Sequence, residues 1–307
     1  MFFQTTIRDS IELNGIGLHS GKKSTVYLMP APVSTGIVFV PYKEDKENSI
    51  RVYIDNLLHS NNAITIGNDS FSIKTIEHFM AAFYALDITN LFVVVDGTEL
   101  PILDGSSNQI VESILETGSQ VQNAFYEIFY LPYPIWIEED GSYLIALPSN
   151  NFKITYTIDF SLKSSAVGTQ TAHFNVTKDT FINELASART FGFLEDIDYL
   201  KANNLAMGGS LHNALVYTRD RLINEDLRFT NECVRHKILD LIGDLSLVGY
   251  KMMGHFIAHK SGHSMDMALV KKIDRIIKRR KKTPAISREL LEKRNKEFKE
   301  FKKRMNL

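Results

Sequence analysis

The 307-residue sequence is poor in cysteine and has no long apolar run. Its single cysteine, Cys233, cannot form an internal disulfide or a zinc site built from several thiolates. The apolar runs are short, such as Leu91 to Val95, whereas a membrane-spanning helix needs about 20 consecutive apolar residues. The first ten residues lack a basic start followed by an apolar stretch, so we expect no secretory signal. These absences favour a protein that works in a reducing cytoplasm.

Charge is distributed unevenly along the chain. The net charge is −1, but residues 271–307 carry a balance of +11 and the remaining residues a balance of −12. The acidic body excludes a protein built mainly around binding the phosphate backbone of nucleic acids. The basic segment has two interpretations: a charged, partly solvated helix, or a surface attracted to an anionic membrane or nucleic acid.

The order of predicted elements indicates the fold class. Hydrophobic residues make up 44% of the chain, which excludes an intrinsically disordered protein. The spacing of apolar residues predicts helices over 75–86, 178–188, 231–250 and 264–277. Runs rich in β-branched residues predict strands between them. Strands followed by helices occur twice, divided near residues 118–125 and without a residue-level repeat, which favours two layered α+β domains.

The strongest chemical pattern lies in the predicted helix over 231–250. His236, Asp240 and Asp244 are spaced at i, i+4 and i+8, which places them on one stripe of a helix. A histidine and an aspartate one turn apart can bind the same zinc ion, and a further carboxylate can orient another histidine. The alternative is a His–Asp pair on the surface, which stabilises a helix only slightly. Because most of this helix is apolar, its charged residues favour the metal-binding interpretation.

Two further histidines stand at positions suited to chemistry. Glu77 and His78 are adjacent in the first turn of the predicted helix over 75–86, where the helix dipole favours a carboxylate anion. This pair is either a solvated helix face or a metal ligand beside a general base. His263 follows Gly262 at a predicted strand-to-helix turn, where catalytic groups often lie. A catalytic zinc site needs three protein ligands and one open position, which makes these histidines candidates.

Six segments together resemble one known family. In chain order they are GIGLHSGK (15–22), TIEHFMAA (75–82), ELPILDGS (99–106), SARTFGF (187–193), VRHKILDLIGDL (234–245) and HKSGH (259–263). This set, spread over roughly residues 1–270, is similar to the motifs of the zinc-dependent UDP-3-O-acyl-N-acetylglucosamine deacetylases of lipid A biosynthesis. Taken alone, several of these segments are ordinary glycine-bearing turns, but six separated motifs in one order are highly specific.

The resemblance implies an architecture and a reaction. The fold is α+β, with two similar domains, each a β-sheet with layered helices, packed face to face around a zinc site. The first domain covers 1–121, the second covers 122–275 and includes an insert that forms an acyl-chain passage, and a basic helical or disordered tail covers 276–307. The implied reaction is zinc-dependent hydrolysis of the N-acetyl group of UDP-3-O-(3-hydroxyacyl)-N-acetylglucosamine, which yields the free glucosamine and acetate.

The resemblance also implies roles for individual residues. The three that match the family's zinc ligands are His78, His236 and Asp240. Those that match its catalytic residues are the general base Glu77, the general acid His263, its partner Asp244, and Thr190 near the developing oxyanion. Those that match substrate-binding positions are Lys237, Phe191, Leu18, His19, Asp159, Phe160, Lys260 and Leu211. Leu211 stands where phenylalanine is common and Asp266 where asparagine is common, so the preferred acyl length is left open.

Partners, location and alternatives follow from the same resemblance. We expect an acylated UDP-amino-sugar as substrate, no nucleic acid, and a weak association of the basic tail with an anionic membrane surface. The expected location is the cytoplasm of a Gram-negative-type bacterium. Two alternatives stay open: a zinc amidohydrolase acting on another acylated amino-sugar, and a nucleotide-sugar-binding protein without turnover.

Overall fold

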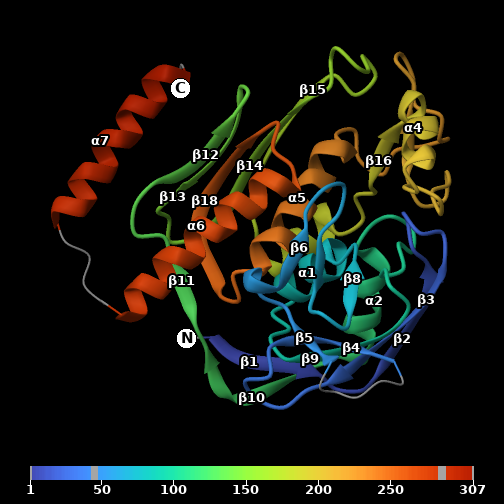
Figure 1. The fold of residues 1–307 in the computed structure, drawn as a ribbon, viewed down its shortest axis with the longest axis horizontal. Coiled ribbons are helices and arrows are strands. Elements are labelled where there is room, and N and C mark those ends of the chain that lie inside the picture. The colour runs from blue at the N-terminus through green and yellow to red at the C-terminus, as the bar shows by residue number, and fades with distance from the viewer. Residues whose placement is uncertain (1, 43–47, 283–287, 306–307) are drawn as a thin grey trace.

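The first half of the chain builds two small sheets that enclose a helix. The computed structural model describes residues 2–42, 48–282 and 288–305. One sheet has the order β2-β3-β9-β4-β5 and the other the order β6-β7-β8 (Figure 1). Their strands are β2 (Ile11–Ile16), β3 (Lys23–Pro30), β4 (Ile37–Pro41), β5 (Ile50–Arg51), β6 (Leu57–His59), β7 (Thr65–Gly67), β8 (Ser72–Lys74) and β9 (Leu91–Asp96). The helices are α1 (Glu77–Ala85) and α2 (Asn108–Thr117).

The second half builds a larger sheet that carries the longest buried helix. The sheet has the order β12-β13-β18-β14-β15, and β11 also pairs with β18. Its strands are β11 (Ile128–Tyr130), β12 (Ile135–Glu139), β13 (Ser142–Leu147), β14 (Phe152–Asp159), β15 (Thr169–Asn175) and β18 (Lys251–His259). An insert between β15 and α5 holds β16 (Phe191–Phe193), α4 (Ile197–Ala202) and β17 (Leu215–Tyr217). The helices α5 (Glu232–Ser246) and α6 (His263–Lys282) lie against one face of the sheet.

The expected α+β class with two layered halves is confirmed. Three predicted helices correspond to α1, α5 and α6. The helix expected over 178–188 differs, because a short α3 (Lys178–Thr180) passes into one π-type turn (Phe181–Leu185) and the chain then extends toward the insert.

Two elements cross the expected domain boundaries. Strand β10 (Ser119–Tyr126) pairs antiparallel with β1 (Phe2–Ile7), so residues beyond 121 are tied to the first half. Helix α6 continues without a break through residues 275 and 276, so the basic segment begins inside a packed helix. The spacing of apolar residues within a segment does not show which distant strand it pairs with, so the sequence did not predict the pairing of β1 with β10.

The two halves meet where α1 crosses α5. Both helices are apolar on nearly all sides, which is typical of helices enclosed in a core. At the crossing, a Cβ added to Gly243 of α5 would lie 2.1 Å from the carbonyl oxygen of Glu77 on α1. A glycine is therefore required at this position, because it lets the backbone of one helix touch the other. The crossing brings the first turn of α1 next to the middle of α5.

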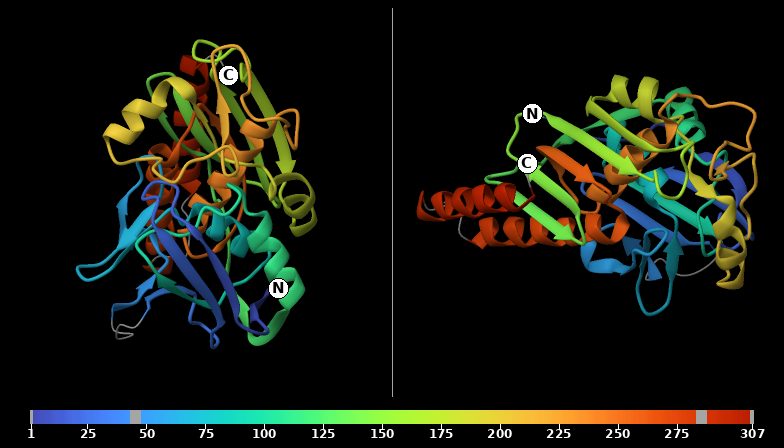
Figure 2. Two further views of the ribbon diagram at one scale, coloured as in Figure 1. Left: turned by 90° about the vertical axis from the view of Figure 1, so that its right-hand side faces the viewer. Right: turned by 90° about the horizontal axis from the view of Figure 1, so that it is seen from above.

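The last helix, α7 (Arg288–Met305), packs on the edge of the second sheet (Figures 1 and 2). The rings of Phe298 and Phe301 lie 5.5 and 5.1 Å from the ring of Trp136 on β12. Phe301 is only 1% exposed, and Arg294 lies over Trp136 from the same side of the helix. Residues 288–305 of the tail are therefore helical, which is one of the two forms expected for it. Residues 283–287 and 306–307 lie outside the described part of the chain.

Candidate active site

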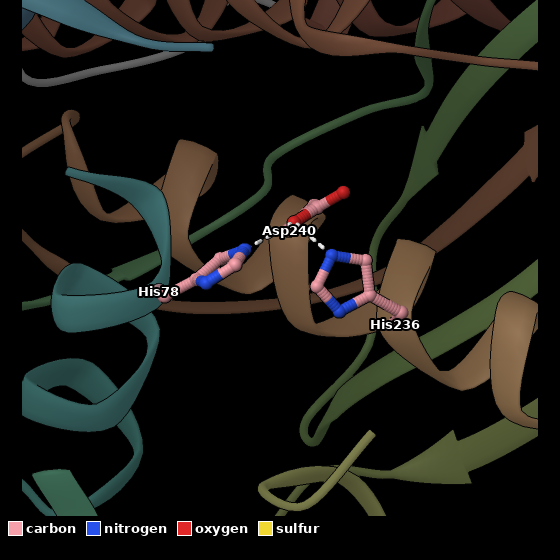
Figure 3. Close-up of side chains that lie close together, drawn as sticks. All are labelled: His78, His236 and Asp240. Atoms are coloured by element: carbon pink, nitrogen blue, oxygen red, sulfur yellow. Dashed lines mark ion pairs between the residues drawn. The ribbon is translucent and has the colours of Figure 1, made fainter. Parts of the chain in front are cut away.

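Three buried side chains at the helix crossing converge on one point (Figure 3). His78 comes from the first turn of α1, and His236 and Asp240 come from α5 one turn apart. Oδ1 of Asp240 lies 3.6 Å from Nε2 of His78 and 3.3 Å from Nε2 of His236. All three side chains are buried, and their ligand atoms lie within 4.8 Å of one another. These distances leave room for one metal ion between the three atoms.

The hydrogen bonds around His236 show that the three residues suit a metal ion. The Nδ1 atom of His236 lies 3.0 Å from the carbonyl oxygen of Ala188, an acceptor, so Nδ1 carries the proton and Nε2 offers a lone pair. Burial lowers the pKa of His236 to about 4, which keeps the imidazole neutral. Nε2 of His236 and Oδ1 of Asp240 are therefore two hydrogen-bond acceptors that face each other without a proton between them. A cation bound by both atoms would turn this repulsive contact into a favourable one. One carboxylate and two imidazoles are a ligand set typical of catalytic zinc.

Lys237 holds the second oxygen of the ligand carboxylate. Its Nζ donates to Oδ2 of Asp240 at 2.7 Å. Burial would raise the pKa of Asp240, but the neighbouring imidazole of His236 and the charge of Lys237 hold this pKa well below its usual range, and with His236 neutral the lysine is the cation that does so. Asp240 is thus an ionised ligand with one oxygen fixed by the protein and the other free to bind a metal.

Glu77 lies beside the three ligand residues and faces His263. Its Oε2 accepts a hydrogen bond from the backbone N–H of Ile64 at 3.1 Å, which fixes the carboxylate. Its Oε1 lies 3.9 Å from Nε2 of His263. The carboxylate and the imidazole are therefore close enough for both to reach one group that lies beside them.

The buried carboxylate of Asp244 forms a hydrogen bond with the imidazole of His263. Nδ1 of His263 donates to Oδ2 of Asp244 at 2.7 Å. Burial would lower the pKa of His263, but the charge and hydrogen bond of Asp244 raise it to about 10. The imidazole is therefore a cation at neutral pH and can act as a proton donor.

Asp266 is a second carboxylate in the same cluster. Its Oδ1 accepts from the hydroxyl of Ser261 at 2.5 Å. Burial and the charge of Asp244 raise the pKa of Asp266 to about 8. This side chain is therefore mostly neutral at pH 7, so it adds little negative charge to the cluster.

Thr190 and Phe191 lie at the start of β16, and Phe191 lies next to a ligand residue. The N–H of Thr190 donates to the carbonyl oxygen of Gly105 at 2.7 Å. The ring of Phe191 lies edge-on to the ring of His236, with centroids 6.5 Å apart. This segment thus places an aromatic ring beside the ligand residue His236.

Three of the predicted substrate residues lie together next to this loop. The ring of Phe160 lies edge-on to that of Phe191, with centroids 5.6 Å apart. Asp159 and Lys260 form an ion pair at 3.3 Å, and hydrogen bonds from Ser161 hold the pKa of Asp159 below its usual range. This group offers an aromatic face and charged side chains of both signs to a polar ligand.

Leu18 and His19 lie against the insert, on the side of the first half. Their carbonyl oxygens accept from the N–H groups of Gly208 and Met207 at 3.0 and 3.1 Å. His19 is buried, and burial lowers its pKa to about 4. Leu211 is 47% exposed on the insert, so the structure does not bring this residue into the cluster around the ligand residues.

Sequence reasoning missed the backbone groups and close contacts that orient these side chains. The carbonyl of Ala188 and the N–H of Ile64 have no sequence signal, because every residue has both groups. Gly243 has a weak signal, a glycine in the middle of an apolar helix. Glu99 has a sequence signal only as part of a motif that, taken alone, is an ordinary glycine-bearing turn.

Comparisons with known proteins place the chain among deacetylases. The model of the family described as UDP-3-O-acyl N-acetylglycosamine deacetylase matches residues 4–275. A protein of Leptospira biflexa named UDP-3-O-acyl-N-acetylglucosamine deacetylase is 44% identical over 272 residues, which cover 87% of this chain and 88% of the relative. A protein of Thermodesulfovibrio yellowstonii with the same name is 41% identical over 273 residues, with 89% and 92% covered. One of Bdellovibrio bacteriovorus, also with this name, is 39% identical over 274 residues, with 89% and 90% covered.

Proposed function

The chain belongs to the UDP-3-O-acyl N-acetylglycosamine deacetylase family, and we propose that it removes the acetyl group with a zinc ion held by His78, His236 and Asp240. The family supports hydrolysis of an amide bond on a UDP-3-O-acyl-N-acetylglucosamine substrate in lipid A biosynthesis. The observation that carries the metal assignment is the contact between the lone pair of His236 and the carboxylate of Asp240, 3.3 Å apart. When bound, zinc supplies a Lewis acid that acidifies water and polarises a carbonyl oxygen.

The chain's own residues then move the protons. Glu77 accepts the proton of the attacking water, and the hydroxyl of Thr190 donates to the developing oxyanion. A donor of this kind typically contributes about 3–4 kcal/mol to transition-state stabilisation. The nitrogen cannot leave as an amide anion, so it takes a proton from His263. Asp244 supports this step because it keeps His263 protonated at neutral pH.

The remaining site residues bind and orient the parts of the substrate that do not react. We assign Lys237 to a contact with the substrate near the amide, beside the loop that carries Phe191. The Asp159, Phe160 and Lys260 group is assigned to the UDP moiety. We assign Leu18, His19 and Leu211 to the cleft wall and the acyl passage. Positioning of this kind can contribute several kcal/mol to the rate.

Zinc content and turnover measured on the same samples test the assignment. His236→Ala should lose the metal, because one of three ligands is gone. Glu77→Ala should keep the metal and slow the reaction by about 10²–10⁴-fold, the usual range for general acid–base catalysis. Full activity of metal-free protein would contradict the zinc assignment.

A comparison of two substrates separates the alternatives. The UDP-linked 3-O-acyl compound should be deacetylated much faster than its 3-OH form. Turnover of the 3-OH form alone would favour an amidohydrolase for another amino-sugar. Binding without turnover of either compound would favour a nucleotide-sugar-binding protein. The paired Glu77 and His263 support turnover, because a binding protein needs neither an acid nor a base.

The basic helices support a second, weaker proposal about location. No helix in the described ranges is long and apolar enough to cross a membrane. We propose a cytoplasmic enzyme without a nucleic-acid partner, whose C-terminal helices are weakly attracted to anionic membranes. Exposed lysines on α7, among them Lys296, Lys299 and Lys303, carry this attraction. Each basic residue near such a surface contributes about 1 kcal/mol, and salt screens it.

Vesicle binding at low and high salt tests this proposal. Reversal of Lys296, Lys299 and Lys303 to Glu should abolish sedimentation with anionic vesicles. A matched reversal of Lys23, Lys178 and Lys201, which are exposed on the body, should not. Charge reversal is preferable to deletion from residue 278, because Lys278 pairs with Asp274 and a deletion would uncover Trp136. Equal binding to neutral and anionic vesicles would contradict an electrostatic attraction.

A further inference from the structure

One buried carboxylate outside the reacting groups connects two parts of the site. Glu99 is 3% exposed and lies between β8 and the loop of residues 17–21. Its Oε1 accepts from the hydroxyl of Thr75 at 2.8 Å and from the N–H of His19 at 2.9 Å. Its Oε2 accepts from the N–H of Ser20 at 2.7 Å. Burial would raise the pKa of Glu99, but these hydrogen bonds lower it, so the side chain is an ionised acceptor.

Thr75 is the first of the two parts. Its φ of 60° lies in the left-handed region, which is rare for a β-branched residue. Its N–H donates to the carbonyl oxygen of Ile64 at 2.9 Å, and the N–H of Ile64 fixes the carboxylate of Glu77. Thr75 also lies two residues before Glu77 at the entry to α1. The conformation of Thr75 therefore sets both the start of the helix and the position of the base.

The loop of residues 17–21 is the second part. A Cβ added to Gly17 would lie 2.3 Å from Oε2 of Glu99, so the loop closes directly around this carboxylate. The loop in turn holds the insert through the backbone bonds to Met207 and Gly208. A Cβ added to Gly208 would lie 2.3 Å from the carbonyl oxygen of Gly17, so the loop and the insert are in direct backbone contact.

We propose that Glu99 is a positioning residue that fixes helix α1, which carries the base Glu77, relative to the loop of residues 17–21 and the insert. Its bond to Thr75 positions Glu77. Its bonds to His19 and Ser20 position the loop and the insert, which together we call the wall of the site. This inference rests on the deacetylase activity proposed above. The two sets of bonds predict separable kinetic effects, because the base acts on the chemical step and the wall acts on binding of the acyl chain.

A pair of substitutions at Thr75 tests the first set of bonds. Thr75→Val has nearly the same shape but no hydroxyl, and it should lower kcat about tenfold with KM and zinc content unchanged, since a hydrogen bond to a charged group is lost. Thr75→Ser keeps the hydroxyl and should retain the wild-type kcat. A wild-type kcat in Thr75→Val would overturn the proposal, and an equal loss in both variants would assign Thr75 to backbone strain alone and overturn it too.

Glu99→Leu tests the coupling of the two sets. Leucine offers no acceptor to the donors of Thr75, His19 and Ser20, so we expect kcat to fall about tenfold and KM for the long-chain substrate to rise. In the Glu99→Leu background, Thr75→Val should cause no further loss of kcat, because the bond is already absent. A full additional loss would overturn the proposal. If Glu99→Leu does not fold, the Thr75 pair decides alone. Lack of activity in the wild type would refute the proposed function instead.

Discussion

Gly243→Ala is a one-carbon change that tests how the site is held together. Carbon and oxygen atoms in ordinary contact lie about 3.5–4.0 Å apart, whereas the new Cβ would lie 2.1 Å from the carbonyl oxygen of Glu77. The two helices must therefore separate by more than about 1 Å. His78 moves with α1, while His236 and Asp240 stay on α5.

Two effects of this substitution oppose each other in the free energy of unfolding. Alanine has the higher helix propensity, by about 0.8–1.0 kcal/mol. Overpacking in a core costs about 1–3 kcal/mol. Because the clash is with backbone rather than with a flexible side chain, we expect overpacking to dominate and Tm to fall by a few degrees.

The functional loss should be larger than the loss of stability. Metal ligands need their positions within about 0.2 Å, and a displacement of about 1 Å at a reacting site can cost about 10²-fold in rate. We therefore expect much weaker zinc binding, measured by competition with a chelator, and a fall of about 10²-fold in kcat/KM. Gly192→Ala is the matched control for metal affinity, because its added Cβ meets no atom within 4 Å. Wild-type zinc affinity together with a raised Tm in Gly243→Ala would refute this reasoning.

Three further predictions concern the acid, a ligand and the last helix. Asp244→Asn removes the charge that raises the pKa of His263 to about 10, so its loss in kcat/KM should be larger at pH 8 than at pH 6; a loss independent of pH would contradict this role. The pKa of His236 is lowered from 6.5 to about 4 by burial, so metal-free protein should lose stability as pH falls through this range. In metal-free His236→Gln, Tm should depend less steeply on pH over this range. An unchanged slope would show that other groups cause the loss of stability. Phe301→Ala should red-shift the emission of Trp136, the single tryptophan, and leave kcat/KM unchanged; a large loss of activity would tie α7 to the site.

The helices that carry the site were predictable because their signals are local. Apolar residues at helical spacing and the i, i+4, i+8 pattern identified α5 and its polar stripe, and Glu77 and His78 were placed in a first turn. The pairing of β1 with β10 was not predictable, since the register of strands distant in sequence depends on the whole fold. The turn after Thr180 also differed from a regular helix, because apolar spacing does not distinguish an α from a π hydrogen-bond pattern.

The last helix shows what composition alone does not reveal about a segment. The charge of +11 over residues 271–307 indicated a partly solvated helix, and most of the lysines of α7 are exposed. Two phenylalanines on the other side pack on Trp136, more than 150 residues earlier in the chain. The partner of such an amphipathic stripe is known only once the fold is known.

The electrostatics of the assembled site explain why these charges can be buried together. Asp244 pairs with His263 at 2.7 Å, and Asp240 pairs with Lys237 at 2.7 Å, so each of these two buried carboxylates has its own cation. Glu77 has no such partner of its own, since among the described residues the nearest cationic nitrogen lies 3.9 Å away on His263, which already pairs with Asp244. A buried carboxylate without a full partner is costly. The cluster therefore holds an excess of negative charge beside three converging ligand atoms, and a divalent cation bound there offsets it. The cost of burying this cluster is thus carried by groups that the proposed reaction uses, and Glu77 is one of them.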